Sequence, residues 1–263
     1  PVLFVPGAGC GSALRFGEAD LHRRGVELIT VSRPGMGDSD PVPGRTLAST
    51  GRDVAALAAE FGGSLPIVAH SQGAPFGLAA AAAGAASRLV LVSPVDELAA
   101  PSVRETLPVA LRDLVDAVGR DPSDAPVPFV DFTAESLFDF VLGSFPSSDA
   151  PVLDDDAFRR MFRKSLAEGF RHGSTAYATD CGLVWRPWGI DLSTIATPTT
   201  IVAGRDDVAH AADHGAGLAR RLPRAVRFVV DGVGGSLLWA RPDLVLSLAL
   251  GESGVQELRK RTA

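Results

Sequence analysis

Six short apolar segments constrain the fold of this chain more than any other feature. They are rich in Val, Ile and Leu, and they lie at PVLFV (1–5), VELITV (26–31), LPIVA (65–69), RLVLV (88–92), TTIVA (199–203) and VRFVV (226–230). Runs this short and this apolar are typical of strands buried on both faces of a parallel sheet. Helical patterns separate them, at 47–61, 74–86, 211–222 and 242–250. The alternation predicts an α/β fold with a mostly parallel open sheet and helices on both faces.

One long segment, 97–193, departs from this alternation. It has helical patterns at 107–118 and 155–170 and several Pro-rich joints, but no buried strand pattern. An insertion of this length between two strands is usually a lid or cap over a functional site. We therefore expect an α/β core from 1–96 and 194–263, with a helical cap insertion at 97–193.

Composition excludes several classes of partner. The 263 residues carry a net charge of −6, which supplies no basic field for nucleic acid. No apolar window approaches the roughly 20 residues that a membrane span requires. The opening segment PVLFV shows neither the charged region nor the cleavage site of a signal peptide. We expect a cytoplasmic protein with no membrane and no nucleic-acid partner; its oligomeric state has no signal in the sequence.

The cysteines give no sign of a metal site or a disulfide framework. Only Cys10 and Cys181 are present, far apart in sequence and without a neighbouring His or Cys at metal-ligand spacing. We expect no metal and no cofactor.

The segment LPIVAHSQGAPFGL (65–78) contains the strongest chemical signal. An apolar strand runs directly into Ser71, and a helix of small residues follows. The G-x-S-x-G nucleophile elbow needs small residues because its serine lies on a strained strand-to-helix turn. Here Ala69 replaces the first glycine, which still leaves room. We predict Ser71 as nucleophile and the backbone N–H of Gln72 as one oxyanion donor, with His70 facing away as a structural neighbour.

A second signal is the Gly-rich turn PGAGCGS (6–12) after the first strand. Backbone amides in such a turn can point at an anionic oxygen, and the N–H of Ala8 is the natural second oxyanion donor. A rival interpretation is a dinucleotide-binding turn, with Arg33 accepting a 2′-phosphate. The spacing disfavours it, because Ser12 stands where the last glycine of G-x-G-x-x-G would be.

In order, the chain has a strand, a Gly turn, a strand, RPGMGDS (33–39), a strand and AHSQG (69–73). This order resembles the α/β-hydrolase fold family, across 1–95 and again across 186–250. The resemblance implies the same fold and a serine-hydrolase type of site, with the segment between as a generic helical cap.

The resemblance also implies where the acid of the site lies. In the family's G-x-x-D pattern the acid is the third residue after Gly204, which is Asp207. Asp206 is the less favoured register, and Asp96 stands at a position that some relatives use instead.

The loop DGVGGSLLW (231–239) lacks the residue that the resemblance predicts. Relatives have G-x-G-H here, and Gly235 stands at the histidine position. A serine hydroxyl is a poor nucleophile unless an adjacent base takes its proton, so another base is needed for hydrolysis. His210 is the best placed by sequence, three residues beyond Asp207 on the same loop.

Other interpretations stay open at this point. His214, inside a helical pattern, and His172, in the cap, are weaker candidates for the base. The protein could instead perform carbonyl chemistry without an acyl-enzyme, such as elimination, cyclisation or epimerisation. It could also be a catalytically silent ligand binder, or a hydrolase whose histidine was removed by mutagenesis.

The expected cap holds most of the aromatic residues, and they suggest the substrate. These are Phe129, Phe132, Phe138, Phe140, Phe145, Phe162, Phe170, Trp185 and Trp188. We expect more than half of them to pack the cap's own core and the rest to line an apolar cleft. Such a cleft favours a small or medium apolar acyl substrate: an ester, a thioester or a polyketide-like compound.

Overall fold

The computed structural model describes residues 1–252, and its centre is a six-stranded sheet in the order β2-β1-β3-β4-β5-β6. Every neighbouring pair of strands is parallel. The strands are β1 Val2–Val5, β2 Leu28–Thr30, β3 Leu65–His70, β4 Ala86–Val92, β5 Thr199–Gly204 and β6 Ala225–Val230. All six predicted strands are present, so the prediction of a parallel α/β sheet is confirmed.

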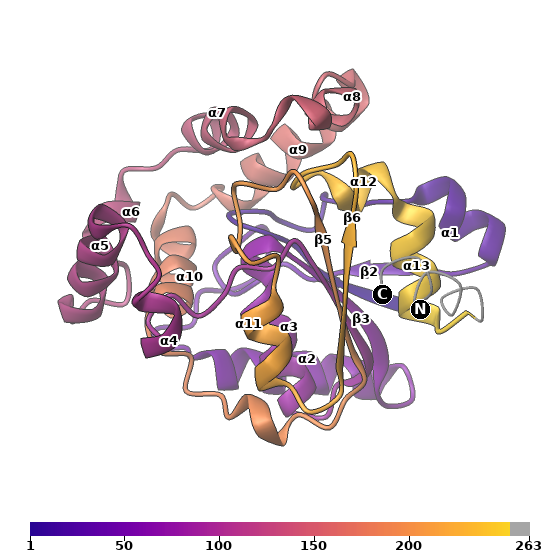
Figure 1. Ribbon diagram of the computed structural model, residues 1–263, viewed down its shortest axis with the longest axis horizontal. Helices are drawn as coiled ribbons and strands as arrows, with labels where there is room; N and C mark the ends of the chain where they lie inside the picture. Colours follow the sequence, from indigo (N-terminus) through magenta and orange to yellow (C-terminus); the bar gives the residue numbers. More distant parts are fainter. Residues whose placement is uncertain (253–263) are drawn as a thin grey trace.

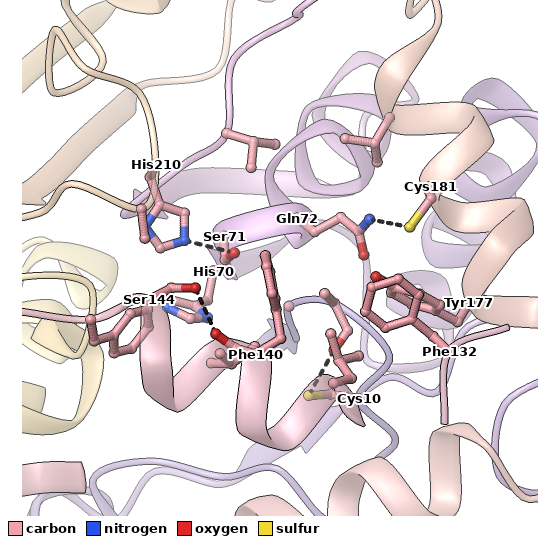
Figure 2. A pocket seen from close by; sticks show the side chains of 18 of the residues that line it. Cys10, His70, Ser71, Gln72, Phe132, Phe140, Ser144, Tyr177, Cys181 and His210 are labelled. Carbon is pink, nitrogen blue, oxygen red and sulfur yellow. Dashed lines mark hydrogen bonds between the residues drawn. The ribbon is translucent and has the colours of Figure 1, made fainter. Parts of the chain in front are cut away.

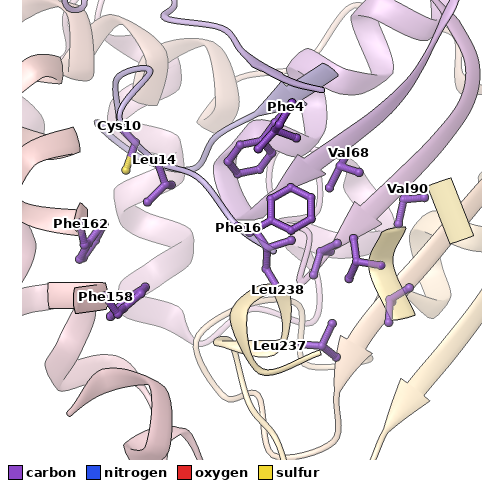
Figure 3. Close-up of a cluster of buried hydrophobic side chains, with 14 of the residues drawn as sticks. Phe4, Cys10, Leu14, Phe16, Val68, Val90, Phe158, Phe162, Leu237 and Leu238 are labelled. Carbon is purple, nitrogen blue, oxygen red and sulfur yellow. The ribbon is translucent and has the colours of Figure 1, made fainter. Parts of the chain in front are cut away.

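Helices cover both faces of this sheet, as Figure 1 shows. Residues of α2 (Leu47–Glu60), α3 (Ala74–Ala82) and α11 (Ala216–Arg221) belong to one buried cluster with one face of the strands. Residues of α1 (Glu18–Arg24), α12 (Leu237–Ala240) and α13 (Pro242–Leu250) belong to the cluster on the other face. Figure 3 shows part of this second cluster, in which Phe4 and Phe16 meet edge to face at 5.2 Å.

Helix α3 lies deepest because its residues are small and apolar on every side. Its residues 74–81 are all buried. Helix α2 packs closely against it, since a Cβ added at Gly51 would lie 2.4 Å from the carbonyl oxygen of Ala79. Helix α2 itself begins with a capping box in which Thr46 and Ser49 exchange hydrogen bonds.

Two helices are shorter than the sequence pattern predicts. The pattern at 74–86 ends at Ala82, because Gly84 adopts a left-handed φ of 81° and β4 starts two residues later. The pattern at 211–222 becomes helical only from Ala216. The placement of His214 in a helix was therefore wrong: it lies in a turn, with a φ of 55°.

Within residues 1–252 no strand lies between β4 and β5; the chain there forms helices. They are α4 Pro101–Arg104, α5 Val109–Arg120, α6 Val127–Val130, α7 Ala134–Ser144, α8 Ala150–Leu153, α9 Asp156–Gly169 and α10 Thr175–Trp185. In Figure 1, α4, α5, α6 and α10 lie to the left of the sheet, and α7, α8 and α9 lie across the top of the view. The division into a core and a cap unit stays a prediction, and its last residues, 253–263, lie outside the described part.

Helix α9 is seated directly on the Gly-rich turn that follows β1. The backbone N–H of Gly11 donates to the carbonyl of Ser165 at 3.0 Å, and the Ser165 hydroxyl donates back to the carbonyl of Gly11 at 3.1 Å. A Cβ added at Gly169 would lie 1.8 Å from the carbonyl oxygen of Gly9. This contact holds the turn against the helical segment.

None of the helices within residues 1–252 is long and apolar enough to cross a membrane.

Candidate active site

Ser71 lies on a strained turn between β3 and α3. Its φ is 52°, a left-handed value that is costly for a residue with a side chain. A single 3₁₀ turn, Ser71–Gly73, connects the strand to the helix. At Gly73 an added Cβ would lie 2.5 Å from the carbonyl oxygen of Val5, so only glycine fits this approach to β1. The local structure is the strand–turn–helix that the sequence predicts.

The structure also explains why alanine is tolerated at position 69. Ala69 is fully buried, and its Cβ faces α3 at Gly77. A Cβ added at Gly77 would come within 2.7 Å of the Ala69 Cβ. Because Gly77 has no side chain, α3 leaves room for the Ala69 methyl group, and a glycine is not required at position 69.

Asp207 and His210 lie on one tight turn after β5. The Asp207 Oδ1 accepts hydrogen bonds from the backbone N–H groups of Ala209, at 3.0 Å, and His210, at 3.2 Å. The same carboxylate contacts the His210 ring, with Nδ1 at 3.0 Å from Oδ1 and 2.9 Å from Oδ2. A turn closed by its own aspartate thus fixes the histidine ring.

The other nitrogen of this ring reaches Ser71. His210 Nε2 lies 2.8 Å from Ser71 Oγ, as Figure 2 shows. A carboxylate can only accept hydrogen bonds, so the proton between His210 and Asp207 belongs to Nδ1. Nε2 is then free to accept the hydrogen bond that the Ser71 hydroxyl donates. This Ser–His–Asp arrangement can activate a serine by general-base catalysis.

His210 and Asp207 are both shielded from water, with 9 % of the His210 side chain and 3 % of the Asp207 side chain exposed. Burial by itself raises the pKa of Asp207. The hydrogen bond and charge of His210 and the N–H of Ala209 oppose this, and the net pKa lies below the usual 3.8. Asp207 is therefore ionised at neutral pH.

The space next to Gly235 is already taken. A Cβ added there would lie 2.8 Å and 2.9 Å from two ring atoms of Phe145, and 3.1 Å from the Cε1 atom of His210. A side chain at position 235 would therefore point into the volume that the His210 and Phe145 rings fill.

The loop around Gly235 is fixed by a buried carboxylate from the helical segment. Asp149 is fully buried and accepts hydrogen bonds from the N–H of Gly234 at 2.8 Å and the hydroxyl of Ser236 at 2.6 Å. This contact holds the loop in place.

The weaker candidates are occupied elsewhere. His214 Nε2 lies 3.0 Å from the carbonyl oxygen of Arg205, and His172 Nε2 lies 3.1 Å from that of Gly37. Asp96 is ion-paired with Arg221 of α11. Burial raises the pKa of Asp96 in spite of that pair.

The Asp206 side chain, half-buried beside Asp207, has no hydrogen bond or ion pair with any residue within 1–252. None of these four side chains contacts Ser71.

The expectation that His70 faces away from the site is wrong, because His70 borders the cavity in front of Ser71. Its Nε2 lies 3.4 Å from the carbonyl oxygen of Gly235, and its ring meets Trp239 edge to face at 4.9 Å. Burial lowers the pKa of His70 from 6.5 to about 3, helped by the nearby His210 ring. His70 is thus a neutral residue that supports the walls of the site.

Both residues predicted as oxyanion donors, Ala8 and Gln72, lie at the cavity that contains Ser71. The N–H of Ala8 donates to no group within residues 1–252, because the Gly-rich turn leaves it outside the sheet. Backbone N–H groups beside a nucleophile can stabilise a negative oxygen.

Arg33 has a structural task that is incompatible with binding a 2′-phosphate. It is 1 % exposed and donates to the carbonyl oxygens of Pro6, at 2.7 Å, and Gly7, at 2.8 Å. Its charge is balanced by Asp180 of α10, at 2.5 Å from Nε, and Asp180 also pairs with Arg45. Arg33 therefore connects the Gly-rich turn to the helical segment, and the rival dinucleotide interpretation fails.

A cavity of about 540 Å³ opens in front of Ser71, between the carboxyl ends of the strands and the helical segment. Its size is that of a small-molecule site. Six of the nine aromatic residues singled out in the sequence line it, which corrects the expectation that most would only pack a cap core. The six are Phe129, Phe132, Phe140, Phe145, Phe162 and Trp185. Within residues 1–252 the lining contains no Asp, Glu, Lys or Arg.

Both cysteines also line this cavity, as thiols. Burial raises the pKa of Cys10 and of Cys181 to about 12, so neither is a thiolate at neutral pH. Gln72 Nε2 donates to the Cys181 sulfur at 3.2 Å (Figure 2). Within residues 1–252 no group of three or more His, Cys, Asp or Glu side chains could hold a metal ion.

Several residues of the site have no clear signal in the sequence. Phe158, Tyr177 and Trp239 line the cavity although each belongs to an ordinary helical pattern. Asp180 could have been found, since it is the single acidic residue in the otherwise uncharged helix TAYATDCGLVW and is fully buried.

Solved structures with the same architecture include three enzymes of low sequence identity. The enol-lactonase from Burkholderia xenovorans LB400 is 18 % identical, with a TM-score of 0.65, over 95 % of this chain and 91 % of that chain. A thermophilic esterase from Thermogutta terrifontis is 19 % identical, with a TM-score of 0.64, over 100 % and 90 %. A protein designated a non-heme bromoperoxidase from Mycobacterium tuberculosis H37Rv is 18 % identical, with a TM-score of 0.68, over 95 % and 90 %.

At these identities the likenesses show the fold alone. A search of curated proteins found no match to the sequence. The family model described as the alpha/beta hydrolase family, however, matches residues 2–248, nearly the whole chain. The parallel sheet, the serine turn after β3 and this match agree, and the chain belongs to the alpha/beta hydrolase family.

Proposed function

We propose that the protein is a serine hydrolase that cleaves esters or thioesters of apolar acyl groups, with His210 as the base in place of a histidine at position 235. The observation that carries the proposal is the position of the His210 ring. It lies 2.8 Å from the Ser71 hydroxyl and 2.9 Å from the Asp207 carboxylate.

In this proposal the Ser71 oxygen attacks the acyl carbon while His210 Nε2 takes the hydroxyl proton. Asp207 stabilises the imidazolium that forms and keeps the ring oriented. The alcohol or thiol leaves with the proton from Nε2, and the acyl group stays on Ser71. A water molecule then attacks the acyl carbon and gives a proton to Nε2, which passes it to the Ser71 oxygen as the bond to the acyl carbon breaks, so that the acid is released and the Ser71 hydroxyl is restored.

The negative oxygen that forms at each attack needs donors that are already in place. We assign this role to the N–H groups of Ala8 and Gln72, two residues that line the cavity together with the serine. The hydrogen bonds from Arg33 to the two carbonyls before Ala8 support this assignment, because they hold the turn from behind.

The cavity supports a neutral, apolar acyl group as the substrate class. Its lining is mostly aromatic and aliphatic, and among the described residues that line it there is no Lys or Arg to pair with a phosphate or a carboxylate. A volume of about 540 Å³ suits a small or medium acyl compound.

The relation between Gly235 and His210 supports a relocated base over a disarmed site. A histidine at 235 and the observed ring of His210 would compete for one volume. The base then comes from the turn that carries the acid, rather than from the loop after β6.

The test is the hydrolysis of p-nitrophenyl butyrate, together with labelling by a fluorophosphonate probe. Replacing Ser71 with Ala should abolish labelling, and His210→Ala should lower kcat by about 10⁴-fold or more. His214→Ala is the matched control, because this histidine follows the same loop without contacting Ser71, and its kcat should not change. Unchanged turnover in His210→Ala would refute the relocated base; a wild-type protein that binds apolar ligands without turnover would be a silent binder.

A further inference from the structure

A second hollow lies directly behind one wall of the cavity in front of Ser71. It is a groove of about 610 Å³ between the loop before α1 and the helices α8 and α9. Its lining includes the apolar side chains of Phe16, Val152 and Met161 and the charged side chains of Arg15, Glu18, Asp155 and Lys164. The groove therefore presents both apolar and charged side chains.

Only two of the described residues line both hollows, and both are aromatic. They are Phe158 of α9 and Trp239 of α12. Their rings meet edge to face, with centroids 5.0 Å apart. The wall between the cavity and the groove is thus one pair of rings in thickness, and we call this pair the aromatic partition.

The aromatic partition is braced on both sides. Trp239 Nε1 donates to the carbonyl oxygen of Arg15 at 3.0 Å, and its ring packs on His70 beside the serine turn. Phe158 is 8 % exposed and stacks on Phe162 one turn along α9, at 5.7 Å. Figure 3 shows Phe158 and Phe162 pointing from their helix toward Leu14 and Cys10.

We propose that the aromatic partition determines substrate specificity by limiting the length of the acyl chain. An acyl group on Ser71 that extends toward His70 meets the rings of Trp239 and Phe158. Without the Phe158 ring the cavity continues into the groove, where a longer saturated chain lies on Phe16 and Met161. This inference rests on the proposed ester hydrolysis for its substrate, but the two hollows and their shared wall do not.

The experiment compares Phe158→Ala with Phe162→Ala. Both residues are buried phenylalanines on α9. Phe162, however, lines the catalytic cavity and not the groove, so its loss enlarges the cavity without opening the aromatic partition. The substrates are straight-chain p-nitrophenyl esters from acetate to palmitate, with kcat/KM measured for each. Binding is also measured in the absence of a reaction: for each chain length, the Kd of the straight-chain alcohol of the same length is determined by calorimetry for the wild type and both variants.

The wild type should favour short or medium chains in both measurements. Phe158→Ala should move the optimum to longer chains, with about a tenfold gain in the ratio of long-chain to short-chain kcat/KM for every two methylenes newly buried. Phe162→Ala should leave the optimum within the original length range. Adding Ala157→Trp, at the groove, to Phe158→Ala should reverse the shift by refilling the space.

The outcomes separate this inference from the proposed function. If the wild type hydrolyses esters and both Phe variants share one chain-length profile, the partition has no role in specificity and hydrolysis stands. If no variant hydrolyses esters, the proposed function fails, and the alcohol Kd series still decides: a shift in Phe158→Ala alone supports the partition, and no shift overturns it.

Discussion

Replacing Gly235 with His should impair the protein rather than rescue it. If the chain were a hydrolase that had only lost its usual histidine, the substitution would restore a base and raise kcat. The structure predicts the opposite. Gly235 has no left-handed φ that would exclude a side chain, so the outcome depends on space alone.

The distances around position 235 set the size of the effect. The new Cβ would lie 2.8 Å and 2.9 Å from ring atoms of Phe145 and 3.1 Å from His210 Cε1, whereas carbon atoms pack at roughly 3.5 to 4.0 Å. The rings must therefore move by roughly 0.5 Å for the Cβ and further for an imidazole. The contact of 2.8 Å between His210 Nε2 and Ser71 Oγ would then stretch beyond hydrogen-bond reach. Misplacement on this scale lowers kcat by about 10²-fold.

The assay is kcat and KM for p-nitrophenyl butyrate, with the thermal midpoint Tm measured to show that each variant folds. Gly235→Ala should show a smaller loss than Gly235→His, because it adds the Cβ alone. In the double variant Gly235→His with His210→Ala, the new imidazole gains the vacated volume, and kcat should exceed that of His210→Ala. A rise in kcat for Gly235→His in an otherwise wild-type chain would refute the relocated base.

Three further predictions concern the structure that supports the site. Asp180→Ala leaves buried arginine side chains without their counter-charge and should cost about 3 to 5 kcal/mol of unfolding free energy in urea; the surface carboxylate Asp116 serves as control, and its loss should change little. Gly169→Ala should lower both Tm and kcat, because its Cβ would lie 1.8 Å from a backbone oxygen of the turn after β1; an unchanged Tm would contradict this close approach. In the folded state the pKa of His70 is lowered from 6.5 to about 3. Between pH 6.5 and pH 3 the unfolded chain therefore binds more protons than the folded chain, and the free energy of unfolding decreases as the pH falls. The decrease from pH 7 to pH 4 should be on the order of 3 kcal/mol. His70→Gln should lose this acid sensitivity in urea titrations at the two pH values, whereas the exposed His22→Gln should retain it.

The sequence by itself determined the sheet and the position of the serine. Six apolar segments predicted six strands, because a buried parallel strand has to be apolar on both faces. The small residues around Ser71 predicted a strained turn, since a larger side chain at Gly73 would collide with β1. The residue types within these short segments carried the prediction, although the contacts that require them, such as that of Gly73 with β1, are made only in the fold.

The histidine was only partly determined by sequence. Its spacing from Asp207 made His210 the leading candidate, but that spacing could not show whether its ring reaches Ser71. The structure places His210 alone against both Ser71 and Asp207, because the carboxylate closes the turn between them. The catalytic roles themselves stay predictions.

Only the tertiary structure decided the shape of the cavity. Phe158 and Trp239 are 81 positions apart in the numbering and form one wall, and Asp180 balances Arg33 from a helix far along the chain. The pairing itself leaves no periodic pattern, since Phe158 and Trp239 each look like ordinary members of their own helices and the sequence does not show which buried charge Asp180 meets. The partners are chosen when the helical segment packs on the carboxyl edge of the sheet, and that packing depends on long-range contacts that no short stretch of sequence contains.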